Sequence, residues 1–178
     1  SQRAAGNHAL EYAVHAANRQ QLPVLVFFGL TPDFPRANTR HYSFMLEGLQ
    51  DAERELRRRR IKLVIRAISP QEGVTELAGN AALVVTDRGY LRIQKKWRRM
   101  AARRISCPLV QVESDVIVPV ETASDKEEYS AATLRRKLLP LRDRYLQALR
   151  STPVRKSSLR LPVRGMDIAD IPAVLGRV

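Results

Sequence analysis

The chain has 178 residues, with 31 Lys or Arg against 18 Asp or Glu, so its formal net charge is +13 and its pI is near 10.8. The single cysteine, Cys107, excludes an internal disulfide and suits a reducing compartment. No segment approaches the roughly 18 apolar residues that a membrane helix needs. The positive charge favours a polyanionic partner, nucleic acid first and an anionic membrane second, unless a GC-rich genome alone explains the arginines.

Predicted helices and strands alternate along the first two thirds of the chain. Helices are predicted over 7–21, 38–59, 69–78 and 91–105, where apolar residues recur at helical spacing and where Asn7 and Ser69 supply start signals. Strands are predicted over 24–30, 61–68, 81–86 and 108–113, because these runs are almost continuously apolar, as in parallel strands buried on both faces. Residues 116–120 are predicted as a short apolar turn or edge segment.

The character of the sequence changes after residue 123. Ser124, with Glu127 three residues later, resembles a capping box and predicts a helix over 124–150 that Pro140 kinks or splits. The residues expected on its buried side are Leu134, Leu138, Leu141, Tyr145 and Leu149. We therefore expect an α/β domain over 1–123, a helical segment over 124–150 and a linker or tail over 151–178.

The alternation of strands and helices predicts a Rossmann-like, doubly wound α/β fold. The sheet should be mainly parallel, with about five strands and with helices on both faces. Ligands of such sheets bind beyond the carboxyl ends of the strands. The candidate site residues selected in this way are Phe28, Gly29, Leu30, Thr86, Asp87, Arg88, Leu91, Arg92 and Asp115.

No standard catalytic motif is present, since the chain lacks a P-loop, a Gly-x-Gly-x-x-Gly run and a Gly-x-Ser-x-Gly elbow. The loop over 86–92 leaves a buried strand and enters a helix, so its free amides could hold a polar ligand. An ordinary strand-to-helix turn capped by Asp87 explains the same residues equally well. The helix over 91–105 carries seven cations, which predict either a solvated outer face or a contact with phosphates.

Several motifs together resemble the class II DNA photolyases, which repair cyclobutane pyrimidine dimers with light. Residues 40–50 read Arg-His-Tyr-Ser-Phe-Met-Leu-Glu-Gly-Leu-Gln, and residues 123–126 read Ala-Ser-Asp-Lys, followed by Tyr129. Val-Thr-Asp at 85–87 precedes Leu91, Arg92 and Trp97 at the spacing of the family. Arg3 and Asn7 are similar to the opening signature of the family and join the candidate site.

The resemblance implies an N-terminal domain that holds an antenna chromophore of the 8-hydroxy-deazaflavin type. It also implies a separate helical domain with FAD, which would follow this chain and repair damaged DNA by electron transfer. We expect this fragment alone to lack catalysis, and we expect the whole protein to be a cytoplasmic monomer without a membrane segment. A stand-alone nucleotide-binding module and a basic scaffold that binds DNA phosphates are the alternatives.

The chain also departs from the family pattern. Members of the family carry a strand just before Gln2, and the sequence here has none. Residues 113–116 read Glu-Ser-Asp-Val where the family has Asp-Ala-His-Asn, and residues 120–121 read Val-Glu where the family has Cys-Trp. These departures lie near the predicted ligand edge, so they bear on pigment binding.

Overall fold

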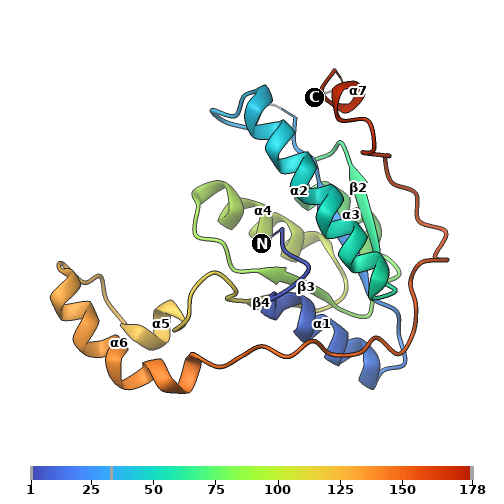
Figure 1. Ribbon diagram of the computed structural model, residues 1–178. Coiled ribbons are helices and arrows are strands. Elements are labelled where there is room, and N and C mark those ends of the chain that lie inside the picture. The colour runs from blue at the N-terminus through green and yellow to red at the C-terminus, as the bar shows by residue number, and fades with distance from the viewer. Residues whose placement is uncertain (1, 33, 177–178) are drawn as a thin grey trace.

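The structure is a computed structural model that describes residues 2–32 and 34–176. Its elements in chain order are α1 (His8–Arg19), β1 (Leu25–Gly29), α2 (Thr39–Arg58), β2 (Lys62–Arg66), α3 (Pro70–Ala78), β3 (Val84–Asp87), α4 (Arg92–Arg104), β4 (Leu109–Val112), α5 (Val120–Ala123), α6 (Ala131–Tyr145) and α7 (Ile171–Leu175) (Figure 1). The predicted alternation of helices and strands up to β4 is confirmed. No helix in the described part of the chain is long and apolar enough to cross a membrane.

The described strands form two parallel pairs. β1 pairs with β2 in the register Leu25 to Lys62, and β3 pairs with β4 in the register Val84 to Leu109. The α/β class is confirmed, but the described residues contain four strands in two separate pairs, where we expected about five in one sheet. The pairs stay separate because no described segment forms hydrogen bonds with both β1 and β3.

Helices cover both faces of the first pair. Phe27 of β1 points toward α3, since a Cβ atom placed on Gly73 of that helix would lie 2.2 Å from the Phe27 ring. Phe28 packs on the other side, against the buried cluster that contains Leu46 and Leu49 of α2. Successive side chains of a strand point to opposite faces, so α2 and α3 lie on opposite sides of β1.

Two apolar clusters make up the core. The first joins α1 to the end of α2 and the start of β2, with Val14 and Ile61 almost fully buried. The second joins β1, α2 and β2 to the C-terminal segment through Leu30, Ile65 and Ile168. The core therefore includes residues that lie more than a hundred positions apart in the sequence.

Residues 151–168 run along β2 as an extended segment. The Ser158 N–H donates to the Arg60 carbonyl at 3.1 Å, and the Ser158 hydroxyl accepts from the Lys62 N–H at 2.7 Å. Further along, the Met166 N–H donates to the Ile65 carbonyl at 2.7 Å. The segment thus covers the side of β2 that does not pair with β1, and α7 follows it.

The prediction of a helix from Ser124 to residue 150 is wrong at both ends. Ser124 terminates α5, and its hydroxyl donates to Glu128, so the proposed capping box with Glu127 does not form. Instead, Ser130 caps α6 by accepting from the Thr133 N–H. Pro140 does not split α6, which runs without interruption to Tyr145.

The predicted burial of the α6 leucines is only partial, since Leu134, Leu138 and Leu141 are half-buried. No residue of α6 is buried, and Leu149 lies beyond the end of the helix. The reason is that α5 and α6 project away from the rest of the molecule, as Figure 1 shows at the left. The apolar stripe of α6 is therefore only half-buried among the described residues.

Candidate functional site

A cavity of about 1190 Å³ lies between the two strand pairs. Its walls include Leu25 and Phe28 of β1 and Val84 and Val85 of β3. Helices contribute further walls, with Ala17 of α1 on one side. The apolar lining therefore comes from strands, helices and loops together, and it includes the ends of strands, where ligands bind to parallel sheets.

Five of the predicted site residues line this cavity: Phe28, Gly29, Thr86, Asp87 and Asp115. They come from the ends of β1 and β3 and from the loop after β4. The structure therefore brings together the carboxyl ends of three strands, as the topology predicts. The remaining predicted residues lie elsewhere, and their surroundings differ.

Gly29 is the last residue of β1, and the close approach of the backbone before α3 leaves no room for a side chain there. A Cβ atom at this position would lie 2.8 Å from the Ile68 carbonyl oxygen and 2.9 Å from the Pro70 backbone. Any other residue would push the start of α3 away from β1. Gly29 thus keeps the rim of the cavity narrow, independently of any ligand.

Arg3 and Asn7 lie outside the cavity wall and connect the start of the chain to the end of β4. The Arg3 guanidinium donates to the Ser114 carbonyl at 3.3 Å, and the Asn7 amide donates to the Arg3 carbonyl at 2.9 Å. The Asn7 side chain also caps α1 by accepting from the Leu10 N–H. Both residues therefore hold the N-terminal segment beside the carboxyl edge.

Leu30, Leu91 and Arg92 take up three different positions outside the cavity. Leu30 is fully buried in the second core cluster. Leu91 immediately precedes α4 and is 59% exposed, and Arg92 is exposed at the first position of that helix. These three residues do not come together with the five that line the cavity.

Arg88 belongs to a cluster of charged and phenolic groups next to the cavity. Its guanidinium pairs with Glu121 and lies 3.8 Å from a carboxylate oxygen of Glu113. The hydrogen bond with Glu121 raises the pKa of Arg88 and lowers that of Glu121. Two carboxylates thus neutralise Arg88, which is a less available donor than the sequence indicates.

Tyr90 and Glu113 are further members of this cluster, and both lie at strand ends where the topology predicts a site, although neither is among the selected site residues. The Tyr90 hydroxyl donates to Glu113, and the other donor to the same carboxylate oxygen is the Val120 N–H at 3.2 Å. Burial, and then the hydrogen bond to Glu113, raises the pKa of Tyr90 to about 12. The phenol therefore stays protonated, and the cluster ties the loop after β3 to the start of α5.

Comparison with known proteins identifies the family. The family model described as DNA photolyase matches residues 1–156. This chain belongs to the DNA photolyase family. The resemblance seen in the sequence is confirmed, and the chain is an N-terminal domain of that family.

Three relatives, each named deoxyribodipyrimidine photo-lyase, show the extent of the match. The protein of Methanothermobacter thermautotrophicus is 53% identical over 155 residues, covering 87% of this chain and 35% of the relative. That of Potorous tridactylus is 35% identical over 77% of this chain and 26% of the relative, and that of Arabidopsis thaliana is 34% identical over 82% and 30%. The chain thus spans about a third of the length of these relatives.

Two further features of the cavity in this photolyase domain bear on ligand binding. The rings of Phe34 and Trp97, which both line the cavity, lie 6.2 Å apart at 57°. The Gln71 side chain is 9% exposed, and its Oε1 has no hydrogen-bond partner among the described residues. Trp97 belongs to the predicted helix over 91–105 and to the motif shared with the family, whereas no sequence signal marks Gln71.

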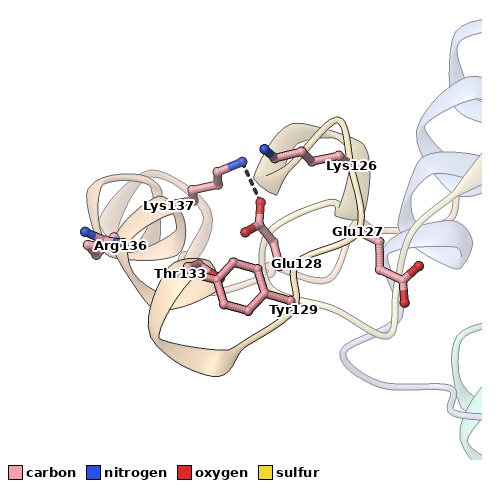
Figure 2. A pocket seen from close by; sticks show the side chains of 7 residues that line it. All are labelled: Lys126, Glu127, Glu128, Tyr129, Thr133, Arg136 and Lys137. Carbon is pink, nitrogen blue, oxygen red and sulfur yellow. Dashed lines mark ion pairs between the residues drawn. The ribbon is translucent and has the colours of Figure 1, made fainter.

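A smaller hollow of about 460 Å³ lies between the loop over 126–129 and the first turns of α6, as Figure 2 shows. Glu128 points toward Lys137, and the two side chains form an ion pair at 2.6 Å. This pairing, together with hydrogen bonds from Ser124 and Thr133, lowers the pKa of Glu128 to about 2. Because the charges compensate each other, the hollow is a structural contact of the photolyase domain with no evident ligand chemistry.

Proposed function

We propose that this photolyase domain holds a planar antenna chromophore of the 8-hydroxy-deazaflavin type at the carboxyl ends of its strands. The observation that carries the proposal is the cavity lined by Phe28, Thr86, Asp87 and Asp115. Apolar walls suit a flat ring system, and a few polar groups at the rim suit its orientation. The partnerless Gln71 Oε1 supplies a buried acceptor for an N–H group of such a ring.

An antenna passes excitation energy through space, so its domain needs no acid, base or nucleophile. The protein has only to hold the ring rigidly and exclude water from it. The short β1-to-α3 connection at Gly29 and the Tyr90–Glu113 cluster both fix the rim in place. A site that is rich in packing contacts and poor in catalytic groups agrees with this role.

For the whole protein we propose repair of cyclobutane pyrimidine dimers in DNA by electron transfer from reduced FAD. The names of the relatives support this activity, and their greater length leaves room for a second, FAD-binding domain. We further propose that residues 1–123 form the antenna domain and that 124–150 lead toward the catalytic domain. The protein would act as a cytoplasmic monomer, in keeping with its single free thiol at Cys107.

The projecting α5–α6 unit supports a contact with that catalytic domain. Leu139 and Leu146 are more than half exposed, and Tyr129, just before α6, is 91% exposed. Exposed large apolar side chains on and beside a projecting helix are typical of an interaction surface. We propose that this surface packs on the helical FAD domain.

The basic outer side of α4 supports a role in attracting DNA. The helix has seven cations and no carboxylate: Arg92, Lys95, Lys96, Arg98, Arg99, Arg103 and Arg104. Within the described residues, Arg98 bonds to the neutral Gln111, and no ion pair neutralises the other six. An uncompensated row of this kind raises the rate of encounter with phosphates at low salt.

The antenna proposal is tested by titrating the chain with an 8-hydroxy-deazaflavin and following its visible absorption band. A red-shifted, saturable band is expected, and replacing Gln71 by Met should weaken the binding. Gln147→Met is a matched control, since Gln147 lies beyond the end of α6 and does not line the cavity. The absence of any saturable shift with a folded chain would overturn the antenna role.

A further inference from the structure

The ends of α1 and α2 meet the extended segment along β2 at one corner of the molecule, at the lower right of Figure 1. The Asn18 side chain donates to the Pro153 carbonyl at 2.8 Å and accepts from the Arg155 N–H at 2.9 Å. The Arg60 carbonyl accepts from the Ser157 hydroxyl at 3.3 Å. These hydrogen bonds hold the extended segment against both helix ends.

Exposed cations without a partner gather at this corner. We call them the basic corner, which consists of Arg19, Arg57, Arg60, Arg155 and Lys156. Among the described residues, none of these five side chains forms a hydrogen bond or an ion pair. None of them lines the cavity between the strand pairs. Their charges are therefore available to a partner outside the domain.

Carboxylates of the same two helices are taken up by other arginines. Glu11 of α1 is buried in its ion pair with Arg59, where the closest nitrogen and oxygen atoms are 2.7 Å apart. Glu55 of α2 pairs with Arg58. Each of these two carboxylates is thus compensated by an arginine outside the basic corner, which keeps its positive charge.

The helix dipole explains only part of the basic corner. Cations in the last turn of a helix interact favourably with its carboxyl end, and this accounts for Arg19 on α1 and Arg57 on α2. Arg60 lies beyond the end of α2, and Arg155 and Lys156 belong to no helix. Three of the five charges therefore lie outside the last turn of any helix, where the effect of the dipole falls off.

The backbone of Arg60 is strained. Its φ is 64°, in the left-handed region that residues with a Cβ atom rarely adopt. The Ile61 N–H donates to the Leu56 carbonyl at 2.9 Å, which closes a Schellman turn with Arg60 at its left-handed position. Glycine is the usual residue at this position. The chain thus carries an exposed arginine without a partner where glycine would remove the strain, and an outlier of this kind points to a function for the side chain.

We propose that the basic corner binds the phosphate backbone of duplex DNA, whether or not the DNA carries a lesion. Arginine side chains suit phosphate oxygens, because the guanidinium donates two parallel hydrogen bonds to them. The basic corner contains no aromatic side chain that could stack on a base, so the contact reads no sequence. It rests on the proposed function only for the choice of DNA as the polyanion. Such a contact holds the protein on undamaged DNA between lesions.

The test is a titration of the chain with a short undamaged duplex, followed by fluorescence anisotropy at several salt concentrations. Each phosphate contact adds about 0.9 to the slope of log K against log salt. Arg60→Gln should therefore lower the slope by about 0.9 and weaken binding about eightfold near 0.1 M salt. The double variant Arg155→Gln with Lys156→Gln should lower the slope by about 1.8. A duplex that carries a pyrimidine dimer should give the same values, and a clear preference for it would contradict the proposal.

Arg58→Gln is the matched control. It removes the same charge from the same end of α2, but Arg58 is paired with Glu55, so binding should weaken less than about twofold. Equal losses for Arg58→Gln and Arg60→Gln would mean that only the net charge matters, and they would overturn the proposal. Duplex binding that falls in the α4 variant Lys95→Gln but not in Arg60→Gln would overturn it as well. The same holds if Arg60→Gln weakens binding to phosphatidylserine vesicles and leaves duplex binding unchanged.

Arg60→Gly separates binding from folding. Glycine adopts a φ of 64° without strain, so the urea midpoint should not fall, whereas duplex binding should weaken as it does in Arg60→Gln. A lower midpoint would show that the arginine supports the fold, and it would contradict the inference from strain. The deazaflavin titration of both variants should match that of the parent chain, because Arg60 does not line the cavity. Failure of the antenna role and failure of the basic corner therefore appear in different assays.

Discussion

The ion pair between Glu11 and Arg59 provides the sharpest stability prediction. Its closest nitrogen–oxygen distance is 2.7 Å, and the two side chains are only 9% and 18% exposed. Arg59 also donates to the carbonyls of Ala4 and Thr152, and Glu11 accepts from the Thr152 N–H at 2.7 Å. The pair therefore joins α1, the end of α2 and the C-terminal segment at one point.

Replacing Arg59 by Met leaves the Glu11 carboxylate buried with a single remaining donor. Removing one partner of a buried ion pair costs roughly 3–5 kcal/mol, and the partial exposure of Arg59 reduces this, so we expect a loss of about 3 kcal/mol. The double variant Glu11→Gln with Arg59→Met should lose less than the sum of the two single changes, because no uncompensated charge stays buried. Urea unfolding followed by circular dichroism measures all three losses.

The neighbouring residue Arg58 provides a matched control. It pairs with Glu55 on the same helix, but the two side chains are 75% and 53% exposed. Exposed pairs contribute about 0.2–1 kcal/mol, so Arg58→Met should cost less than about 0.5 kcal/mol. Equal losses for Arg58→Met and Arg59→Met, or additive losses in the double variant, would refute the reasoning.

Three more predictions follow from local contacts. The pKa of Glu128, about 2, lies below the unfolded value of about 4.3. Its ionised form therefore contributes to stability fully above pH 4.3, and this contribution is lost as the pH falls toward 2. Lys137→Met should raise the pKa of Glu128 in an NMR titration. Gly73→Ala should destabilise by about 1 kcal/mol in urea, since the new Cβ meets an aromatic ring, whereas Gly48→Ala, with open space, should stabilise by about 0.5–1 kcal/mol. Tyr90 should ionise near pH 12 by ultraviolet absorbance, and ionisation near 10 would contradict its burial.

Local elements of this chain could be predicted from sequence because each has its own signals. Asn7 caps α1 as predicted, and proline at the start of α3 marks that helix correctly. Strands β1 and β2 lie within the predicted apolar runs 24–30 and 61–68, and each is shorter than its run, with five residues. The start of α6 was misplaced because Ser124 and Ser130 both satisfy the rules for a cap, and only the contacts of Glu128 with Lys137 favour the later one.

The division of the sheet could not be predicted, because sequence patterns identify strands but not their partners. The runs that form β1 and β3 are equally apolar, and nothing in them indicates that no described strand joins them. The path of residues 151–168 also could not be predicted from the sequence, since a segment rich in Ser, Pro and Arg shows no periodicity. Its order comes from hydrogen bonds to distant residues such as Lys62.

Five of the predicted site residues line one cavity, because parallel strands end at a common edge whatever their side chains are. The assignment failed to bring in Leu30, since the first residue after a strand can turn into the core as easily as toward a ligand. The sequence also does not show that Arg88 is neutralised, because its partners Glu113 and Glu121 come from later segments. Pairing between distant charges is a property of the folded chain.

The extended segment along β2 has a consequence for the order in which the domain forms during synthesis. Ser158 completes the surroundings of Arg60 and Lys62, nearly a hundred residues earlier, and Ile168 enters a core cluster that starts with Leu30. A ribosome must therefore release most of the chain before β2 gains its outer neighbour. Until then β2 presents an open edge, and a chaperone that binds nascent chains would find its target there.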